Sequence, residues 1–473
     1  MKKSVLFIFV LAFSISNLLA QTFTNIEAGI PGIKYSSSSA WGDYDNDGLL
    51  DLIVCGEPDG GIDTTLLYHN GGDLGFVVVP GTGFIDVSLG DVEWGDFNND
   101  SYLDLLVVGY NNYISVAELY VNNGDGTFTQ QTSTGIPGVY MGDIDFADYN
   151  NDGYLDIGIS GFDNSYVFIT KVFQNNQDLT FTEQSGLTLE GLNFGKFKWG
   201  DYNNDGLADF VINGFGDDSY VTELWKNNGG GAFTEASSVD LHQGWLGDMA
   251  WGDYDVDGDL DLVISGTGGD GSERYTIIYT NNGDGSFTEG NGMFFPKVSH
   301  SSLEWADFDG DSDLDLFISG TRDAMGTGNY VGEIHYNNDG NFSQSEEIIA
   351  SYWGDCKVAD YDNSGFPDIF ICGYDVAENG LAEIFNNDRV LSVQSLSLGQ
   401  IKIGPIPAKE TIHVSSEQNI NSYQIYLLSG EELVNQKINS KSFSIDVNGL
   451  PTGTFLLKLS SDKGEEIQKI TVL

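Results

Sequence analysis

A nine-residue acidic motif recurs seven times along this chain. The first copy, Asp43–Asp51, reads DYDNDGLLD, with four aspartates around one glycine. Successive copies are 52 to 54 residues apart. Such a constant period is the signature of a repeat architecture, in which each repeat is one supersecondary unit. The later copies begin at Asp96, Asp148, Asp201, Asp253, Asp307 and Asp360.

Each repeat has the pattern of four short strands. In the second repeat, polar and apolar residues alternate over 91–94, and a run rich in Val and Leu follows the acidic motif at 103–109. A third strand pattern covers 116–122 and ends at NNGDG, a strong hairpin-turn signal, after which TFTQ supplies the fourth strand. No segment has a convincing helical period. This order predicts a four-stranded antiparallel meander, which matches the blade of a β-propeller.

The two ends of the repeat region complement each other. The seventh repeat has no fourth strand after Asn386 and Asn387, whereas the N-terminal segment QTFTNIEAGIPGI (21–33) matches GTFTQQTSTGIPGV (126–139). We expect the N-terminal strand to complete the last blade, because closure would hide the sheet edges. The predicted fold is all-β: a seven-bladed β-propeller of four-stranded blades over 21–393, closed by the N-terminal strand, then a small β-sandwich over 394–473.

The spacing inside each acidic motif predicts a calcium site. Side chains at positions 1, 3, 5 and 9, with the carbonyl of position 7, can converge on one cation, and Ca²⁺ accepts such all-oxygen coordination. Glycine at position 6 permits the sharp reversal in five loops. An EF-hand is excluded because position 12 is Val54 in loop 1 and Val107 in loop 2 rather than Glu. For a single loop, a solvated turn is the alternative, but seven copies in register favour metal binding.

The sequence therefore predicts up to seven calcium ions, one per blade. Loop 7 is expected to bind most weakly, since Ser364 stands at position 5 and Pro367 precedes its last aspartate. The predicted ligands, with position 7 contributing its carbonyl, are Asp43, Asp45, Asp47, Leu49 and Asp51; Asp96, Asn98, Asp100, Tyr102 and Asp104; Asp148, Asn150, Asp152, Tyr154 and Asp156; Asp201, Asn203, Asp205, Leu207 and Asp209; Asp253, Asp255, Asp257, Asp259 and Asp261; Asp307, Asp309, Asp311, Asp313 and Asp315; and Asp360, Asp362, Ser364, Phe366 and Asp368.

Charge and the N-terminus bound the partners and the compartment. The formal net charge is -52, and residues 21–393 hold 63 acidic but only 10 basic side chains. Nucleic acid is excluded as a partner, because binding it requires a basic surface.

Residues 1–20 have Lys2 and Lys3, a short apolar core and a small residue at Ala20, the pattern of a signal peptide. No later segment is long and apolar enough for a transmembrane helix, so the protein is predicted to be exported.

Three cysteines leave two readings open. They are either buried small side chains, or Cys356 and Cys372 form a disulfide while Cys55 stays free. Cys356 lies four residues before the seventh motif and Cys372 four after it, so a hairpin would place the two side by side.

Two segments carry a resemblance to known families. The pattern DxDxDGxxDL followed by NNGDGxFT resembles the FG-GAP/VCBS-type repeat, related to the integrin α-chain propeller, over roughly residues 22–392. That resemblance implies structural calcium on one face and ligand binding on the other. From residue 394, Pro405 and Pro407, IYLLSGEEL and LPTGTFLLKL resemble the C-terminal sorting domain of the type IX (Por) secretion system. This implies export across the outer membrane by that machinery, followed by release or surface attachment.

The face opposite the acidic loops is the predicted ligand surface. Trp41 and the residues aligned with it in the first strands of the other repeats, such as Trp94 and Trp251, form the Trp41 column. Aromatic residues six positions before this column would stand near the central mouth, where they suit stacking on a sugar or anchoring a protein loop. No catalytic residues are predicted, since the five histidines share no repeat position and no G-x-S-x-G elbow occurs. The sequence thus predicts a secreted or cell-surface calcium-binding module for an extracellular glycan or protein, the alternatives being a polysaccharide lyase or a structural spacer. The predicted ligand residues are Tyr35, Tyr140, Trp245 and Tyr352.

Overall fold

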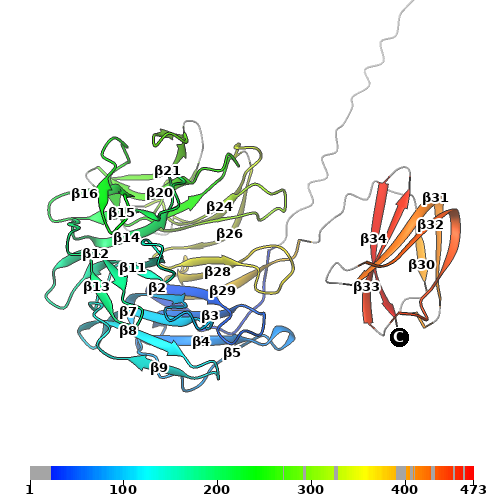
Figure 1. The fold of residues 1–473 in the computed structure, drawn as a ribbon, viewed down its shortest axis with the longest axis horizontal. Coiled ribbons are helices and arrows are strands. Elements are labelled where there is room, and N and C mark those ends of the chain that lie inside the picture. Colours follow the sequence, from blue (N-terminus) through cyan, green and yellow to red (C-terminus); the bar gives the residue numbers. More distant parts are fainter. Residues whose placement is uncertain are drawn as a thin grey trace, which may run out of the picture. The chain divides into compact units, whose positions relative to one another are not determined.

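The chain forms two units, residues 1–389 and residues 390–473 (Figure 1). No helix long and apolar enough to cross a membrane occurs in the described part of the chain. The predicted signal peptide, residues 1–20, lies outside the described residues. The computed structural model describes residues 23–269, 271–290, 295–323, 329–342, 344–389, 401–404, 408–409, 411–427, 432–450, 453–461 and 464–472.

The first unit is all-β, and its repeats are antiparallel meanders of four strands, as predicted. The second repeat holds β6 (Ser88–Gly95), β7 (Asp104–Asn111), β8 (Ile114–Asn122) and β9 (Phe128–Gln131). The third holds β10 (Ile144–Ala147), β11 (Asp156–Phe162), β12 (Phe168–Asn175) and β13 (Phe181–Glu183). The fourth holds β14 (Asn193–Gly200), β15 (Asp209–Phe215), β16 (Tyr220–Asn227) and β17 (Phe233–Glu235).

The next two repeats follow the same order. In the fifth, the first strand is split into β18 (Gly244–Trp245) and β19 (Met249–Gly252), which both pair with β20 (Asp261–Gly268) ahead of β21 (Glu273–Asn281) and β22 (Phe287–Glu289). The sixth holds β23 (Ser299–Ala306), β24 (Asp315–Thr321), β25 (Tyr330–Tyr336) and β26 (Gln344–Ser351).

The first and last repeats share one eight-stranded sheet (Figure 1). The first repeat contributes β2 (Ile33–Gly42), β3 (Asp51–Pro58), β4 (Thr64–Asn70) and β5 (Phe76–Val78), with a 3₁₀ turn η1 (Gly72–Leu74). The last contributes β27 (Cys356–Ala359), β28 (Asp368–Tyr374) and β29 (Gly380–Asn387). The N-terminal strand β1 (Phe23–Asn25) pairs with β29 in the register Phe23↔Asn387, the register in which Phe128 pairs with Asn122. Ile33 of β2 also pairs with Leu381 of β29.

Neighbouring repeats pack through apolar faces. The second strand of each repeat is buried on both faces, which explains its continuous Val, Leu and Ile run. One core cluster joins Leu106 and Val108 of the second repeat to Ile144 and Ile157 of the third. The Trp41 column stacks on the position-2 aromatic of the preceding acidic loop, as in Trp94 on Tyr44 at 6.4 Å between ring centroids. The same stacking joins Trp41 to Tyr361, Trp199 to Tyr149 and Trp305 to Tyr254.

An asparagine at the end of each third strand ties each repeat to the one before it. Asn122 Nδ2 donates a hydrogen bond to the Tyr44 carbonyl oxygen at 2.7 Å, and Asn70 Nδ2 donates to the Tyr361 carbonyl oxygen at 3.0 Å. The second of these bonds links the first repeat to the last. The equivalent bonds run from Asn175 to Phe97, Asn227 to Tyr149, Asn281 to Tyr202, Asn337 to Tyr254 and Asn387 to Phe308.

The second unit is a bent sheet of five strands. The sequence predicts a β-sandwich, but hydrogen bonds join all five strands in one sheet in which β31 pairs with β30, β32 and β33. Register shifts within β31 bend it, so that residues from both halves of the sheet, such as Ile412 and Leu457, share one core. The strands are β30 (Lys402–Gly404), β31 (Thr411–Leu427), β32 (Glu432–Asp446), β33 (Gly453–Ser461) and β34 (Gly464–Val472).

All three cysteines are free thiols. Cys55, Cys356 and Cys372 are each fully buried. The structure therefore supports the reading as small core side chains and has no Cys356–Cys372 disulfide.

Candidate functional site

The acidic motifs form tight loops between the first and second strands of each repeat. In loop 1 the backbone N–H groups of Asp47 and Gly48 both donate to the Asp43 carboxylate, at 3.0 and 2.9 Å. The same pair of bonds recurs in the other loops, for example from Asp152 and Gly153 to Asp148. Gly48 has φ of 91°, a conformation that glycine adopts without strain.

The last aspartate of every loop is fully buried. The carboxylate of Asp51 accepts hydrogen bonds from the backbone N–H groups of Asn70 and Tyr44, at 2.8 and 3.3 Å. Burial, reinforced by Asp45, raises the pKa of Asp51 to about 7. Burial likewise raises the pKa of Asp368 in loop 7 to about 8. A cation bound beside these carboxylates would favour their charged form.

The donor sets suit a hard divalent cation. Carboxylate oxygens of Asp43, Asp45 and Asp47 lie within 4.8 Å of one another. All these donors are oxygens, the ligand type that Ca²⁺ prefers. In loops 3 and 4 the position-3 asparagine reaches the last aspartate, with Asn150 Nδ2 3.1 Å from Asp156. Equivalent convergent groups are Asp253, Asp255 and Asp261; Asp307, Asp309 and Asp311; and Asp360, Asp362 and Asp368.

Basic side chains from other elements reach three loops. His69 Nδ1 lies 3.2 Å from Asp51 and 3.4 Å from Asp45 in loop 1. Lys226 Nζ lies 3.1 Å from Asp205 in loop 4. In loop 6, Arg389 Nη1 lies 3.7 Å from Asp309. The sequence analysis missed these neighbours, although His69 and Lys226 occupy the same position at the end of the third strand.

Adjacent loops are also hydrogen-bonded to one another. The position-4 asparagine donates to the carbonyl oxygen at position 6 of the next loop, as from Asn99 to Gly153 at 2.7 Å. Position 4 has a left-handed backbone in every loop, which Asn tolerates better than other non-glycine residues. Loop 5 has Val256 at this position, with φ of 59°. The other such bonds run from Asn46 to Ser101, Asn151 to Gly206, Asn204 to Gly258 and Asn363 to Gly48.

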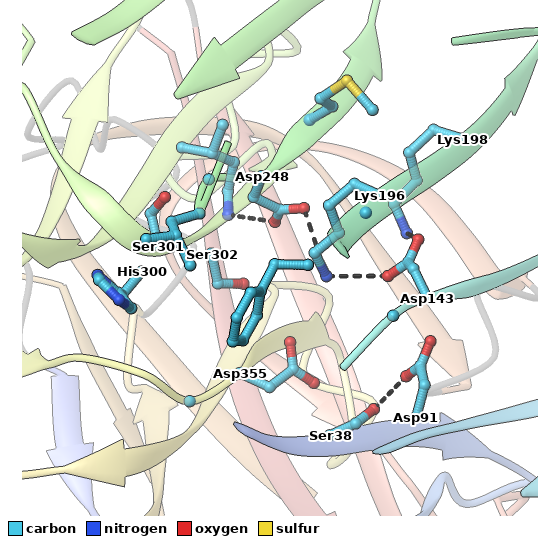
Figure 2. Close-up of a pocket in the computed structure, with 18 of the residues that line it drawn as sticks. Ser38, Asp91, Asp143, Lys196, Lys198, Asp248, His300, Ser301, Ser302 and Asp355 are labelled. Atoms are coloured by element: carbon cyan, nitrogen blue, oxygen red, sulfur yellow. Dashed lines mark hydrogen bonds and ion pairs between the residues drawn. The ribbon is translucent and has the colours of Figure 1, made fainter. Parts of the chain in front are cut away.

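A cavity of about 390 Å³ lies between the first strands of the repeats. Six carboxylates and three ammonium groups line it. Figure 2 shows Asp91, Asp143, Asp248 and Asp355 with Lys196 and Lys198 around the cavity. Most of them alternate along the first strands, as Asp91 and Glu93 do in β6, because alternate residues of a strand share a face. The charged lining residues are Asp91, Glu93, Asp143, Asp248, Glu304, Asp355, Lys196, Lys198 and Lys357.

The lysines of the cavity are paired with some of the carboxylates. Lys196 Nζ lies 2.9 Å from Asp143 and 3.9 Å from Asp248 (Figure 2). Burial alone would raise the pKa of Asp143, but Lys196 and Lys198 outweigh it and lower that pKa. Lys357 Nζ lies 3.6 Å from Glu304.

Two glutamates in the cavity lining are hard to ionise. Burial raises the pKa of Glu93 to about 8 and that of Glu304 to about 7, against the opposing charge of Lys357. Lys357 Nζ is 4.0 Å from Glu93, so it compensates that carboxylate only in part.

Residues next to the predicted ligand positions line the cavity at the strand ends opposite the acidic loops, and they are called the mouth residues here. Tyr140 packs on Tyr110 and Phe162, with ring centroids 4.8 and 5.1 Å away. Trp245 packs on Phe215 at 5.4 Å, and Tyr352 packs on Tyr330 at 4.3 Å. The side chain of Tyr35 lies outside the described residues. The residues after Tyr140, Trp245 and Tyr352, which are Met141, Leu246 and Trp353, line the cavity instead. In three other repeats the equivalent positions are Ser88, Asn193 and Ser299, and the residues after them, Leu89, Phe194 and His300, also line it.

These six mouth residues share a backbone conformation. Their φ angles are 46° to 56°, in the left-handed region. In β6, β14 and β23 the strand register shifts at this point, between Ser88 and Asp91 in the first case. The register shift lets the side chain of the left-handed residue face the cavity. A simple alternating pattern in the sequence does not indicate such a shift.

Comparisons with known proteins identify both parts of the chain. The FG-GAP-like repeat family matches residues 43–107, 96–159, 201–264 and 257–318. The family described as a secretion system C-terminal sorting domain matches residues 402–473. No curated protein matches the sequence.

Several solved structures are similar at low identity. One is PorZ, an essential bacterial surface component of the type-IX secretion system of Porphyromonas gingivalis, at 11% identity and a TM-score of 0.41. The match covers 93% of this chain and 59% of that chain, so this protein spans about three fifths of its length. Another is the V. cholerae biofilm matrix protein Bap1, at 12% identity and a TM-score of 0.34, with 93% and 88% of the two chains covered.

A third similar structure is an exo-beta-1,3-galactanase from Phanerochaete chrysosporium, at 10% identity and a TM-score of 0.29. The match covers 72% of this chain and 99% of that one. Likenesses of this size carry no information on function. The family matches, together with the repeated sheets, are specific: the chain is an FG-GAP-like repeat protein with a type IX (Por) secretion system C-terminal sorting domain, secreted to the cell surface or beyond it.

Proposed function

We propose that this protein is a calcium-stabilised, seven-bladed propeller that binds an extracellular glycan or protein ligand. The observation that carries the proposal is the charged cavity of about 390 Å³ between the first strands, whose lining includes residues at the strand ends opposite the acidic loops, such as Leu89. Small-molecule and side-chain sites are concave and carry a few placed polar groups, as this cavity does.

A closed ring is supported by contacts between the first and last repeats. Strands β1 and β2 pair with β29, and Asn70 donates to the Tyr361 carbonyl oxygen as its counterparts do between successive repeats. Ser39 also donates to the Asp355 carboxylate from its backbone N–H and its hydroxyl, at 2.9 and 2.8 Å. A ring held by the same bonds at every junction has no exposed sheet edge at its ends.

Calcium in the acidic loops is supported by their oxygen donors. Four of the seven loops have an aspartate at each of positions 1, 3 and 9, and in loops 3 and 4 the asparagine at position 3 is hydrogen-bonded to the last aspartate. Like charges this close destabilise the fold unless a cation neutralises them. The ions would hold the hairpins of one face rigid and leave the opposite face for ligands.

The ligand face has exposed apolar side chains around the mouth. The hairpins between second and third strands carry Ile62, Tyr113, Tyr166 and Val376, with exposed fractions of 77%, 85%, 68% and 66%. These hairpins belong to four consecutive repeats if the ring is closed, since Val376 is in the seventh and Ile62 in the first. Exposed tyrosines suit stacking on a sugar ring or contact with a protein surface.

The test is retention of the purified, calcium-loaded chain on immobilised polysaccharides and matrix proteins, with soluble fragments assayed in the same wells. Retention without fragments is expected. Release of soluble fragments would instead identify a polysaccharide-degrading enzyme. A chain that passes unretained over every surface, while calcium still raises its melting temperature, would leave a structural spacer.

A further inference from the structure

We propose that the central cavity binds an organic cation, a guanidinium or ammonium group on an apolar stem, and that Asp248 anchors it. This is the chemistry of an arginine or lysine side chain, carried on a protein or as a free amine. The inference rests on the proposed binding function and adds to it the class of group that enters the cavity.

The cavity has an excess of negative charge. Six carboxylates face three ammonium groups, a surplus of three negative charges when all are ionised and of one while Glu93 and Glu304 hold their protons. Asp91 has only neutral donors within hydrogen-bond distance: the Ser38 hydroxyl and the backbone N–H groups of Val92 and Ile144. Within the described part of the chain, no lysine or arginine lies within 4.0 Å of Asp91 or Asp355. A positively charged ligand would offset this surplus.

Asp248 offers an open acceptor inside the cavity. Its residue is 7% exposed, and its Oδ2 accepts a hydrogen bond from the backbone N–H of Leu303 at 2.9 Å. Its Oδ1 is buried and receives no hydrogen bond from any described residue, with Lys196 Nζ 3.9 Å away (Figure 2). Buried carboxylate oxygens are nearly always hydrogen-bonded, so an acceptor left open at the wall of a cavity points to a donor from outside.

The spacing of the carboxylates favours an organic cation over a metal ion. Among the described residues, the groups whose ligand atoms come within 4.8 Å of one another are made of acidic-loop aspartates, with His69 beside loop 1, and none lines this cavity. Carboxylates set apart around a cavity suit a group with several N–H donors pointing in different directions, as a guanidinium has.

The mouth suits an apolar stem. Leu89, Met141, Phe194, Leu246 and Trp353 contribute apolar side chains there. His300, the sixth mouth residue, has its pKa lowered to about 4 by burial and by Arg274, so it is neutral near pH 7 and does not repel a cation. Methylene groups passing this collar would be buried as the charged end reaches the carboxylates.

The probes are agmatine, acetyl-Gly-Arg-Gly-amide and acetyl-Gly-citrulline-Gly-amide, titrated calorimetrically into the calcium-loaded full chain. Citrulline replaces the guanidinium by a neutral urea of the same shape. We expect the arginine peptide to bind at least about tenfold more tightly than the citrulline peptide, the usual worth of a charge-assisted hydrogen bond. Binding of agmatine and the arginine peptide alike indicates a protein side chain as ligand, and binding of agmatine alone indicates a free amine. Equal binding of both peptides, or no binding by either cation, overturns the proposal.

Two variants of opposite sign exclude a folding defect. Asp248→Asn keeps an acceptor for the Leu303 N–H but removes the charge, and should weaken agmatine binding about tenfold. Lys196→Gln removes the competing ammonium group and should tighten it severalfold. Asp218→Asn is the matched control: it makes the same change on an exposed hairpin outside the cavity and should leave binding unchanged. Weaker binding in Lys196→Gln, or an unchanged affinity in Asp248→Asn, refutes the assignment.

Failure here is distinguishable from failure of the proposed function. Retention on a polysaccharide or matrix protein, with no agmatine binding, would keep the binding function and remove the cavity from it. Loss of retention in Asp248→Asn but not in the Asp218→Asn control would show that the cavity carries the binding function.

Discussion

Val256 is the one position-4 residue among the acidic loops whose replacement should stabilise the protein. It has φ of 59° and is 61% exposed, so its side chain gains little from packing. A left-handed backbone costs an L-residue about 1–2 kcal/mol, and a β-branched residue is least suited to it. Asn204 in the preceding loop adopts nearly the same φ, 53°, and donates to the Gly258 carbonyl oxygen at 3.0 Å.

Val256→Asn should therefore add to the free energy of unfolding in two ways. Relief of backbone strain contributes about 1 kcal/mol. A new hydrogen bond to the carbonyl oxygen of Ser312, the position-6 residue of the next loop, contributes about 0.5 kcal/mol, because the site is exposed. For a unit of this size the sum of about 1.5 kcal/mol corresponds to a rise in melting temperature of about 2 °C.

The assay is scanning calorimetry in saturating calcium, with calcium stoichiometry measured in parallel. Asn99→Val is the reciprocal control, since it removes the 2.7 Å bond to Gly153 and places valine at φ of 59°. It should lower the melting temperature by a similar amount. Val256→Ala should fall between wild type and Val256→Asn, because it removes the branch without adding a donor. A lower melting temperature in Val256→Asn would refute the argument, as would no loss in Asn99→Val.

Three further predictions concern metal, charge and pH. Removing calcium with a chelator should lower the melting temperature of the first unit strongly, by well over the change in any single-loop variant, and an unchanged melt would contradict calcium binding in the loops. Lys226→Gln should tighten calcium binding at loop 4 by roughly fivefold, because a half-exposed ion pair such as Lys226–Asp205 is worth at most about 1 kcal/mol. An unchanged calcium titration would show that the Lys226 ammonium group does not compete with calcium. Burial raises the pKa of Glu93 from 4.5 to about 8; Asp91 and Asp145 reinforce this shift, and Lys357 and Lys198 oppose it. The folded state therefore holds a proton that the unfolded chain releases. The stability that this proton provides is lost as pH rises from about 5 to 8. Glu93→Gln should lose less stability than the wild type over that pH interval, by on the order of 1 kcal/mol, because the Glu93 side chain is 27% exposed to the cavity. The measurement is urea unfolding in saturating calcium. Equal slopes of the free energy of unfolding against pH in the two proteins would count against the prediction.

The acidic loops were readable from the sequence because their geometry is local. Nine consecutive residues contain all the aspartates that converge in loop 1, and the turn chemistry of Asp, Asn and Gly determines how they fold. The N-terminal strand was readable for a related reason. Its residues repeat the pattern of a fourth strand, so its partner β29 could be named from the gap in the last repeat.

The basic side chains that reach the loops from other elements could not be predicted from the sequence. His69, Lys226 and Arg389 belong to third strands or to the segment after one, and only the pairing of strands brings them to Asp51, Asp205 and Asp309. The aromatic residues were placed at the mouth by counting along alternating strands. The left-handed residue at each mouth position breaks that alternation, so that Met141 rather than Tyr140 lines the cavity.

The sequence by itself determined the repeat, the strand order, the acidic loops, the sorting domain and the strongly acidic charge, because each depends on residues near one another in the chain or on composition. Tertiary structure alone decided the central cavity. Asp91, Asp143 and Asp248 are separated by 52 and 105 residues along the chain and look in the sequence like ordinary polar residues of separate strands. Only the packing of the first strands around one space brings them together as buried carboxylates, because low exposure and like charge arise from neighbours on other strands.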